Sequence, residues 1–192
     1  TQQETLFPYT TLFRSVGAEL RKLCAAPDPA PALAAMQRCG ALARVLPGCH
    51  TAAVAPLAAA ETALALAPDA LRRLAAMGCD GSEPLRHSKA DARRLALLRA
   101  GVEGAAGLGE LAWRHGPDTA RDIAALRAAV TGAPLPADAE TRIAQGGAAV
   151  FPVGAKDLMP RLKGRALGDR LAALERRWID SGFALSRDDL LE

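Results

Sequence analysis

Apolar residues recur at helical spacing along this chain, and Gly or Pro interrupts the pattern at short intervals. The clearest stretch is 165–180, where Leu167, Leu171, Leu174 and Trp178 stand at i, i+4, i+7 and i+11. This spacing places apolar side chains on one face of a helix. The same reasoning predicts helices over 16–26, 29–39, 42–46, 56–67, 70–77, 118–130, 138–145 and 187–191, another that begins at 89 and one that ends near 113.

Helix starts and stops are marked by residues with suitable backbone preferences. The expected N-terminal caps are Asp28, Asp69, Ser88 and Ser186, and the expected glycine stops are Gly40, Gly78 and Gly182. The pair Gly146-Gly147 is expected to end the helix over 138–145.

The apolar pattern also predicts which side chains face the core. After Ser88, the expected inward residues are Ala92, Leu95 and Leu98, with Arg93 and Arg94 outward. Over 118–130, the expected buried face carries Ile123, Leu126 and Val130.

Composition agrees with a helical fold. Ala fills 44 of the 192 positions and Leu 28, whereas aromatic residues make up only 4%. Ala and Leu favour helix, and the aromatic and β-branched residues that strands prefer are scarce. The predicted fold is therefore all-α, an irregular multi-helix array with no sheet. The segment TGAPLP over 131–136 is the best candidate for an internal boundary, which predicts domains over 16–132 and 133–192.

The first fifteen residues differ in composition from the rest. TQQETLFPYTTLFRS contains no Ala or Gly and four Thr, whereas Ala is frequent from residue 18 onward. The string PYTTLFRS looks like translated sequencing-adapter sequence, so we expect residues 1–15 to be a non-native leader. The alternatives are a native disordered arm and a segment left over from cloning for expression.

Metal and catalytic motifs are missing from the sequence. The three histidines are isolated, there is no P-loop or nucleophile elbow, and Gly101–Gly109 lacks the order of a dinucleotide fingerprint. We expect that glycine-rich stretch to connect two helices and the pair Asp188-Asp189 to favour a helix N-terminus rather than a metal. We therefore predict no catalytic residues and no metal site in this chain.

The cysteines and the hydropathy favour a soluble cytoplasmic protein. Cys24, Cys39, Cys49 and Cys79 include no C-x-x-C pair, so we expect buried reduced thiols rather than a zinc site. The most apolar stretch, 52–67, contains Pro56 and Glu61 and is mainly Ala, so no transmembrane helix is expected.

Positive charge is concentrated in one segment. Between Lys156 and Arg177 there are seven Lys or Arg and three Asp or Glu, a local net charge of +4 in a chain of net +3. Several of these cations lie near the expected start of the last long helix, where unpaired backbone N–H groups attract anions. The pattern suits a nucleic-acid backbone. The alternative is an ordinary solvated face of an Arg-rich protein.

Two long stretches resemble a known family, the bacterial CCA-adding tRNA nucleotidyltransferases and their poly(A) polymerase relatives. Residues 16–47, VGAELRKLCAAPDPAPALAAMQRCGALARVLP, are similar to the family's E-L-x-K-L-L segment and its G-x-L-x-x-L-P. Residues 151–191, FPVGAKDLMPRLKGRALGDRLAALERRWIDSGFALSRDDLL, are similar to its C-terminal G-x-D-L, G-x-x-L-G and W-I signature. The segments 85–95 and 111–127 resemble its body helices.

The resemblance implies a helical body over 16–132 and an RNA-binding tail over 133–192. The complete enzyme would add C, C and A to tRNA 3′ ends, using CTP, ATP and magnesium, but the family's G-G-x-x-R-D, D-x-D and E-D-x-x-R motifs do not occur here. This portion alone is therefore expected to be inactive and to bind no cofactor. The expected tRNA contacts are Lys156, Arg161, Lys163, Gly164, Arg165, Gly168 and Arg170. Arg176 and Arg177 are set apart because the neighbouring Trp178 is expected in the core.

Two alternatives share this helical pattern. A poly(A) polymerase of the same fold would have the same body and tail. A non-enzymatic helical adaptor for RNA or protein would have no nucleotidyltransferase motifs upstream.

Overall fold

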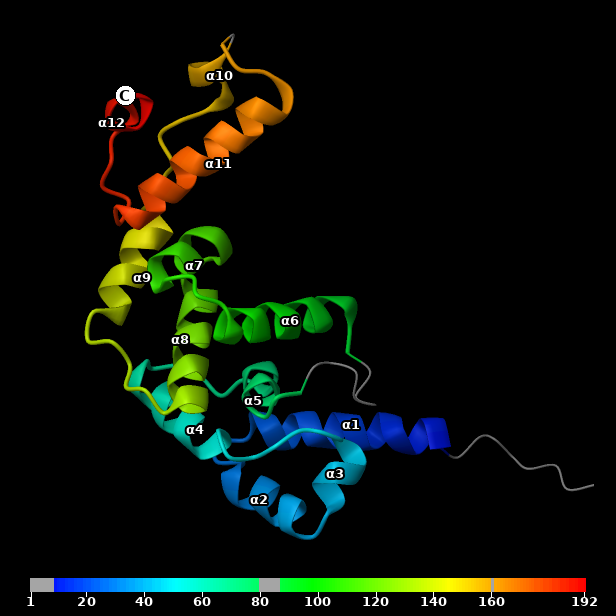
Figure 1. Ribbon diagram of the computed structural model, residues 1–192. Helices are drawn as coiled ribbons and strands as arrows, with labels where there is room; N and C mark the ends of the chain where they lie inside the picture. The colour runs from blue at the N-terminus through cyan, green and yellow to red at the C-terminus, as the bar shows by residue number, and fades with distance from the viewer. Residues whose placement is uncertain (1–8, 80–86, 160) are drawn as a thin grey trace, which may run out of the picture. The chain divides into compact units, whose positions relative to one another are not determined.

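Twelve α-helices make up the regular structure of the described residues in a computed structural model (Figure 1). The structure describes residues 9–79, 87–159 and 161–192, with side chains from residue 16 onward. The helices are α1 Tyr9–Ala25, α2 Ala30–Arg38, α3 Ala41–Val45, α4 Val54–Ala63, α5 Ala70–Ala76, α6 Lys89–Glu103, α7 Leu108–His115, α8 Pro117–Thr131, α9 Ala139–Ala148, α10 Ala155–Leu158, α11 Gly164–Asp180 and α12 Arg187–Leu191. No strand occurs in these ranges, and the predicted all-α class is confirmed.

The chain divides into two compact units. Unit 1 comprises Thr1–Ala105 and Asp122–Pro136, and unit 2 comprises Ala106–Arg121 and Ala137–Glu192. The sequence pattern predicted a single division, after residue 132. The units differ from that division because α7 packs mainly against α9, a contact between segments about 30 residues apart that no local pattern indicates.

Helix α5 forms the centre of unit 1. It contacts α1, α4 and α6, and every residue from Leu71 to Met77 is buried. The predicted N-terminal caps of α5 and of the next helix, α6, are both present. Asp69 accepts a hydrogen bond from the Arg72 backbone N–H at 2.7 Å, and Ser88 accepts one from that of Asp91 at 3.0 Å. These caps satisfy N–H groups that have no partner within their helices.

Two arginines of α5 are buried because a carboxylate lies between them. Arg72 and Arg73 are 3% and 1% exposed, and both donate to Glu61 of α4, at 2.9 and 2.8 Å. Arg73 also donates to the carbonyl of Cys24, at 2.7 Å, and to that of Ala26, at the end of α1. A buried charge requires such partners. These contacts join α1, α4 and α5 within unit 1.

The same network continues to α6 and α8. Arg94 donates to Asp69 and to Asp122, at 2.8 Å each, and Arg72 also pairs with Asp122. Burial opposes the charged form of Asp69, but hydrogen bonds from Arg94 and the Arg72 backbone outweigh it and lower the pKa of Asp69. Arg94, predicted to face outward, keeps 40% of its side chain exposed but also pairs with these two carboxylates of unit 1.

Other details of the predicted faces also change. Leu95, Leu98, Ile123 and Leu126 are fully buried as predicted, but Ala92 is exposed and Val130 is 48% exposed. Near the end of α8, Ala129 instead of Val130 is buried.

Helices α7 and α9 of unit 2 make an unusually close backbone contact. A Cβ placed on Gly146 would lie 2.0 Å from the carbonyl oxygen of Gly109. Only a residue without a side chain fits such a contact. Helix α9 continues through Gly146 and Gly147 to Ala148, so the prediction that these glycines end the helix near residue 145 is wrong.

Aromatic residues fill the rest of the core of unit 2. The Trp178 ring of α11 lies 5.5 Å from that of Trp113, 5.3 Å from Phe151 and 4.9 Å from Phe183. Val153, Leu174 and Leu190 complete this buried cluster.

Two N-terminal expectations differ from the structure. The first helix begins at Tyr9, so the backbone of residues 9–15, assigned to a foreign leader, is continuous with α1. The residue that caps α2 is Pro29 and not Asp28, and no side chain hydrogen-bonds to this helix start. Residues 1–8 of the expected leader lie outside the described residues.

The cysteines do not all form buried reduced thiols. Cys49 and Cys79 form a disulfide, Cys39 is exposed, and Cys24 alone is a buried thiol. Cys49 and Cys79 are 30 residues apart in sequence, and the packing of α5 against the loop after α3 brings them together. Burial raises the pKa of the Cys24 thiol to about 11.

No helix in the described ranges has the length and apolar character needed to cross a membrane.

Candidate nucleic-acid interface

The positively charged segment of unit 2 runs from α10 through the first half of α11. Gly154 begins it, and its backbone N–H donates to the Asp157 carboxylate at 2.7 Å. That carboxylate also accepts from Arg187 of α12 at 2.8 Å. The Gly154 N–H and Arg187 together lower the pKa of Asp157. Asp157, one of two acids within the segment, is thus already paired, and α10 is held in place beside α12.

Helix α11 begins without a local acceptor for its backbone N–H groups. Its N-cap is Lys163, no side chain caps the helix, and the first turn contains no acidic residue. Gly164 has a φ of +56°, which favours glycine, and no described residue lies within 4 Å of where its Cβ would be. An uncapped N-terminus beside a lysine and an arginine attracts anions.

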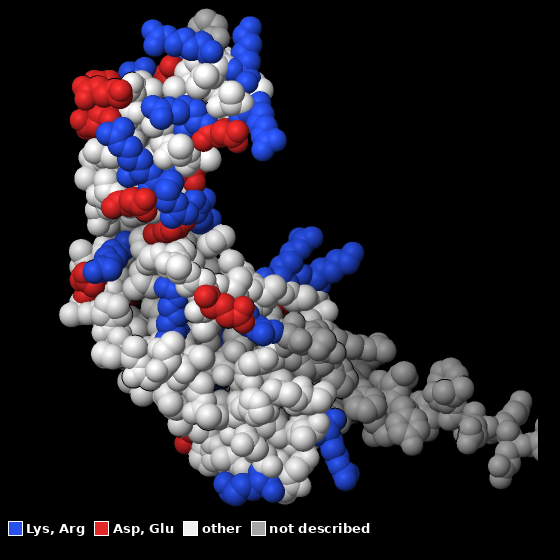
Figure 2. Space-filling view, viewed as in Figure 1, with Lys and Arg blue, Asp and Glu red and all other residues white. Residues whose placement is uncertain are grey.

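The predicted contact residues are all exposed. Arg165 makes a long contact of 3.7 Å with Asp169, and its side chain is 94% exposed. No salt bridge within the described part of unit 2 engages the other predicted cations, which are Lys156, Arg161, Lys163 and Arg170. Figure 2 shows Lys and Arg side chains over α10 and α11 and acidic side chains over α12. These cations can therefore meet a ligand without first breaking a strong ion pair.

Helix geometry separates the predicted residues into two groups. At 3.6 residues per turn, Arg165 and Gly168 lie about 60° apart around the axis, whereas Arg165 and Arg170 lie about 140° apart. Arg165 and Gly168 thus share one side of α11, and Arg170 lies on the other flank. Leu174 and Trp178 occupy the buried face between them. A ligand that contacts both Arg165 and Arg170 must therefore span about 140° around the solvent-facing side of α11.

Arg176 differs from the predicted contact residues because it has an internal partner. It donates to Glu110 of α7 at 3.1 Å, and Arg114 donates to the same carboxylate at 2.9 Å. Trp178 is 2% exposed, as the sequence pattern predicted. Arg176 therefore holds α11 against α7.

A hollow that no sequence pattern indicated lies beside Trp113, Arg114 and His115, with a volume of about 460 Å³. The Arg114 guanidinium lies 5.0 Å from the centre of the Trp113 ring and donates to Glu110 and Glu175. These two acids balance Arg114 and Arg176, so the hollow does not extend the positive charge of α11. In the sequence, the four-residue spacing of Glu110 and Arg114 indicates their ion pair but not the hollow.

The described residues contain no cluster of three or more His, Cys, Asp or Glu that could hold a metal ion. Asp189 instead forms a capping box with Ser186, accepting from its backbone N–H at 2.8 Å and from its hydroxyl at 2.6 Å. These bonds lower the pKa of Asp189. This agrees with the expectation that the acidic pair favours a helix start.

Comparison of the chain with known protein families, with characterised proteins and with solved structures gives no match in any of the three. A functional assignment therefore depends on the chain's own residues.

Proposed function

We propose that this chain is the tRNA-binding body and tail of a CCA-adding tRNA nucleotidyltransferase. In this proposal unit 2 holds the tRNA backbone, and the catalytic carboxylates belong to a nucleotidyltransferase head outside these 192 residues. Magnesium, CTP and ATP would bind to that head, because two-metal activation of a 3′ hydroxyl requires carboxylates at a shared site.

The observation that carries the proposal is the uncapped start of α11 among exposed cations. Lys163 and Arg165 flank Gly164 there, and Lys156 and Arg161 precede it in the chain. Phosphate groups bind to backbone N–H groups at a helix start and to nearby Lys and Arg. Such contacts fix the position of an RNA without reading its sequence. This is the behaviour needed by a protein that binds many tRNAs.

The net charge of unit 2 does not account for the proposed binding of RNA at α10 and α11. Unit 2 contains eleven Lys or Arg and eleven Asp or Glu, whereas unit 1 contains thirteen and ten. Unit 1 therefore carries the whole net charge of +3, and the net charge of unit 2 is zero. Binding through overall attraction would favour unit 1, and binding through the local arrangement favours α10 and α11.

The test is the double variant Lys163→Ala/Arg165→Ala, with tRNA affinity measured over a range of salt concentrations. Each phosphate contact releases about one counterion, so the slope of log K against log salt should fall by about 2. Affinity should fall similarly for tRNAs of different sequence.

The matched control is Lys89→Ala/Arg93→Ala on α6 of unit 1. Both residues are exposed, and the variant loses the same two charges. Its salt slope should remain that of the original chain. Equal slopes for the two double variants would contradict a local binding surface, and no tRNA binding by the original chain would favour the non-enzymatic adaptor.

A further inference from the structure

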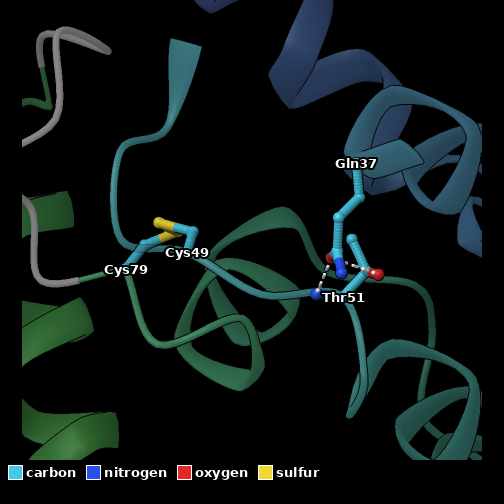
Figure 3. Close-up of a disulfide and its surroundings, with 4 residues drawn as sticks. All are labelled: Gln37, Cys49, Thr51 and Cys79. Atoms are coloured by element: carbon cyan, nitrogen blue, oxygen red, sulfur yellow. Dashed lines mark hydrogen bonds between the residues drawn. A yellow bond between two sulfur atoms is a disulfide. The ribbon is translucent and has the colours of Figure 1, made fainter. Parts of the chain in front are cut away.

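Cys49 and Cys79 connect two segments of unit 1 that are distant in sequence. Cys49 lies in the loop between α3 and α4, and Cys79 follows the C-terminal end of α5. Their Cα atoms are 5.3 Å apart, within the usual range for a disulfide, and the sulfur atoms are bonded (Figure 3). The bond closes a loop that contains α4 and α5.

Hydrogen bonds hold both cysteines in place independently of their sulfur atoms. The His50 N–H donates to the Met77 carbonyl at 2.8 Å, and the Cys79 N–H donates to that of Leu74 at 3.1 Å. These bonds join the residue after Cys49 to the helix end before Cys79. The spacing of the two cysteines therefore does not require the S–S bond.

A second anchor lies at Thr51, two residues after Cys49. The side-chain oxygen of Gln37, at the end of α2, accepts from the Thr51 backbone N–H at 2.8 Å and from its hydroxyl at 2.7 Å. In Figure 3 the Gln37 side chain points at Thr51, and the loop continues from there to Cys49. The loop is thus fixed to α2 and to the end of α5.

The two cysteines also differ in burial. Cys49 is 7% exposed and Cys79 is 1% exposed. A small thiol or disulfide can therefore approach Cys49 more readily than Cys79. The remaining cysteines have different surroundings, because Cys24 is buried under α5 contacts and Cys39 is exposed at the end of α2.

We propose that Cys49 and Cys79 form a reversible redox staple that sets the stability of unit 1. In the reduced state both are thiols, and the hydrogen bonds keep the same fold. Oxidised glutathione, or another small disulfide, accepts the two electrons. The Cys49 thiolate attacks it, forms a mixed disulfide and releases one glutathione thiol. The Cys79 thiolate then displaces the second glutathione and forms the internal bond. Each cysteine loses one proton, and two reduced glutathione molecules form.

The staple has a predictable effect on stability. Closing a loop of about 30 residues reduces the conformational freedom of the unfolded chain. Unit 1 depends on Ala and Leu for its core and contains no described aromatic residue among its buried side chains. Oxidation should therefore raise its melting temperature, by roughly 5–10 °C.

The test uses the whole chain equilibrated at a series of ratios of reduced to oxidised glutathione. The samples are acid-quenched, alkylated in denaturant and digested with trypsin. Each cysteine falls on its own tryptic peptide, over 23–38, 39–44, 45–72 and 74–86. Peptides 45–72 and 74–86 should lose alkylation together, appear as one linked species and regain alkylation in excess reduced glutathione. Circular dichroism should show equal helix content in both states, with the higher melting temperature in the oxidised one.

Three variants make the test specific. Cys39→Ser should retain the linked species and the redox-dependent melting temperature. Cys49→Ser and Cys79→Ser should each lose both and melt near the reduced original chain. In a Cys39→Ser background, Cys79→Ser should accumulate glutathione on peptide 45–72, whereas Cys49→Ser should acquire little on peptide 74–86.

Three outcomes would overturn the proposal. Both peptides could remain alkylated at every ratio, which would mean that no bond forms. The linked species could persist in excess reduced glutathione, which would make the bond permanent. The reduced original chain could lose its helix content, which would show that the fold requires the bond. Because these readings use the original chain, they hold even if a serine variant does not fold.

Discussion

Glu110 illustrates how single residues of unit 2 are stabilised. Its carboxylate is buried, and Arg114 and Arg176 both donate to it. Burial would raise its pKa, but the hydrogen bonds from the two arginines outweigh this effect and lower the pKa of Glu110. The carboxylate is therefore more acidic in the folded chain than in the unfolded chain, and folding is favoured where it is ionised.

We expect Glu110→Gln to lower the free energy of unfolding at pH 7 by ~1–2 kcal/mol. The contribution of Glu110 is fully present above its unfolded pKa of about 4.3 and disappears as the pH falls through the lower, folded value. The difference between the variant and the original chain should therefore shrink below about pH 4.5. Chemical denaturation of both proteins between about pH 3 and pH 7 measures this difference in the free energy of unfolding.

Glu140→Gln is the control, because Glu140 pairs with Arg121 on the surface of the same unit, with its side chain 51% exposed. Its effect at pH 7 should be below about 0.5 kcal/mol. A pH-independent loss in Glu110→Gln would show that packing, not charge, accounts for the role of Glu110.

At the scale of elements, the α7–α9 contact depends on two glycines. Gly146 meets Gly109 so closely that no side chain fits between the helices, whereas a Cβ on the neighbouring Gly147 would lie 3.7 Å from Pro117, an ordinary contact. The two positions lie next to each other in the same helix. Ala substitutions at these two positions therefore separate the effect of helix propensity from the effect of packing.

We expect Gly146→Ala to destabilise the chain by ~2 kcal/mol or more, because the helices must move apart. Gly147→Ala should be neutral or stabilise it by up to about 1 kcal/mol, because Ala favours helix more than Gly does. Thermal denaturation of both variants checks the difference. Equal effects would mean that the close contact contributes nothing to stability.

At the scale of the whole molecule, the proposed division of labour separates binding from chemistry. Incubated with tRNA, CTP, ATP and magnesium, this chain should add no nucleotide, because its sequence contains none of the family's head motifs. Labelled CTP and ATP, with product length read on a sequencing gel, measure this directly. Incorporation above that of a sample without protein would contradict the assignment of catalysis to residues outside this chain.

The two compact units show which parts of the architecture local signals could predict. Ser88, Asp69 and Gly182 mark helix ends through their own backbone and side-chain chemistry, so these boundaries followed from short stretches of sequence. The membership of α7 in unit 2 did not, since it depends on a contact with α9 made later in the chain.

The candidate interface shows the same distinction. Clustering of Lys and Arg along 156–170 is visible in the sequence, and exposure agrees with it. Which arginines have internal partners is not visible, because Arg176 meets Glu110 from 66 positions away. The separation of Arg165 from Arg170 around α11 follows from helix geometry once the helix start is known.

The sequence by itself determined the all-α class, most of the helices and the location of the positive charge, because helix propensity, capping and charge are properties of neighbouring residues. Only the tertiary structure decided the Cys49–Cys79 bond, the burial of Arg72 and Arg73 around Glu61 and the Gly109–Gly146 contact. Each of these joins residues from different helices or loops, and their spacing depends on how the helices pack.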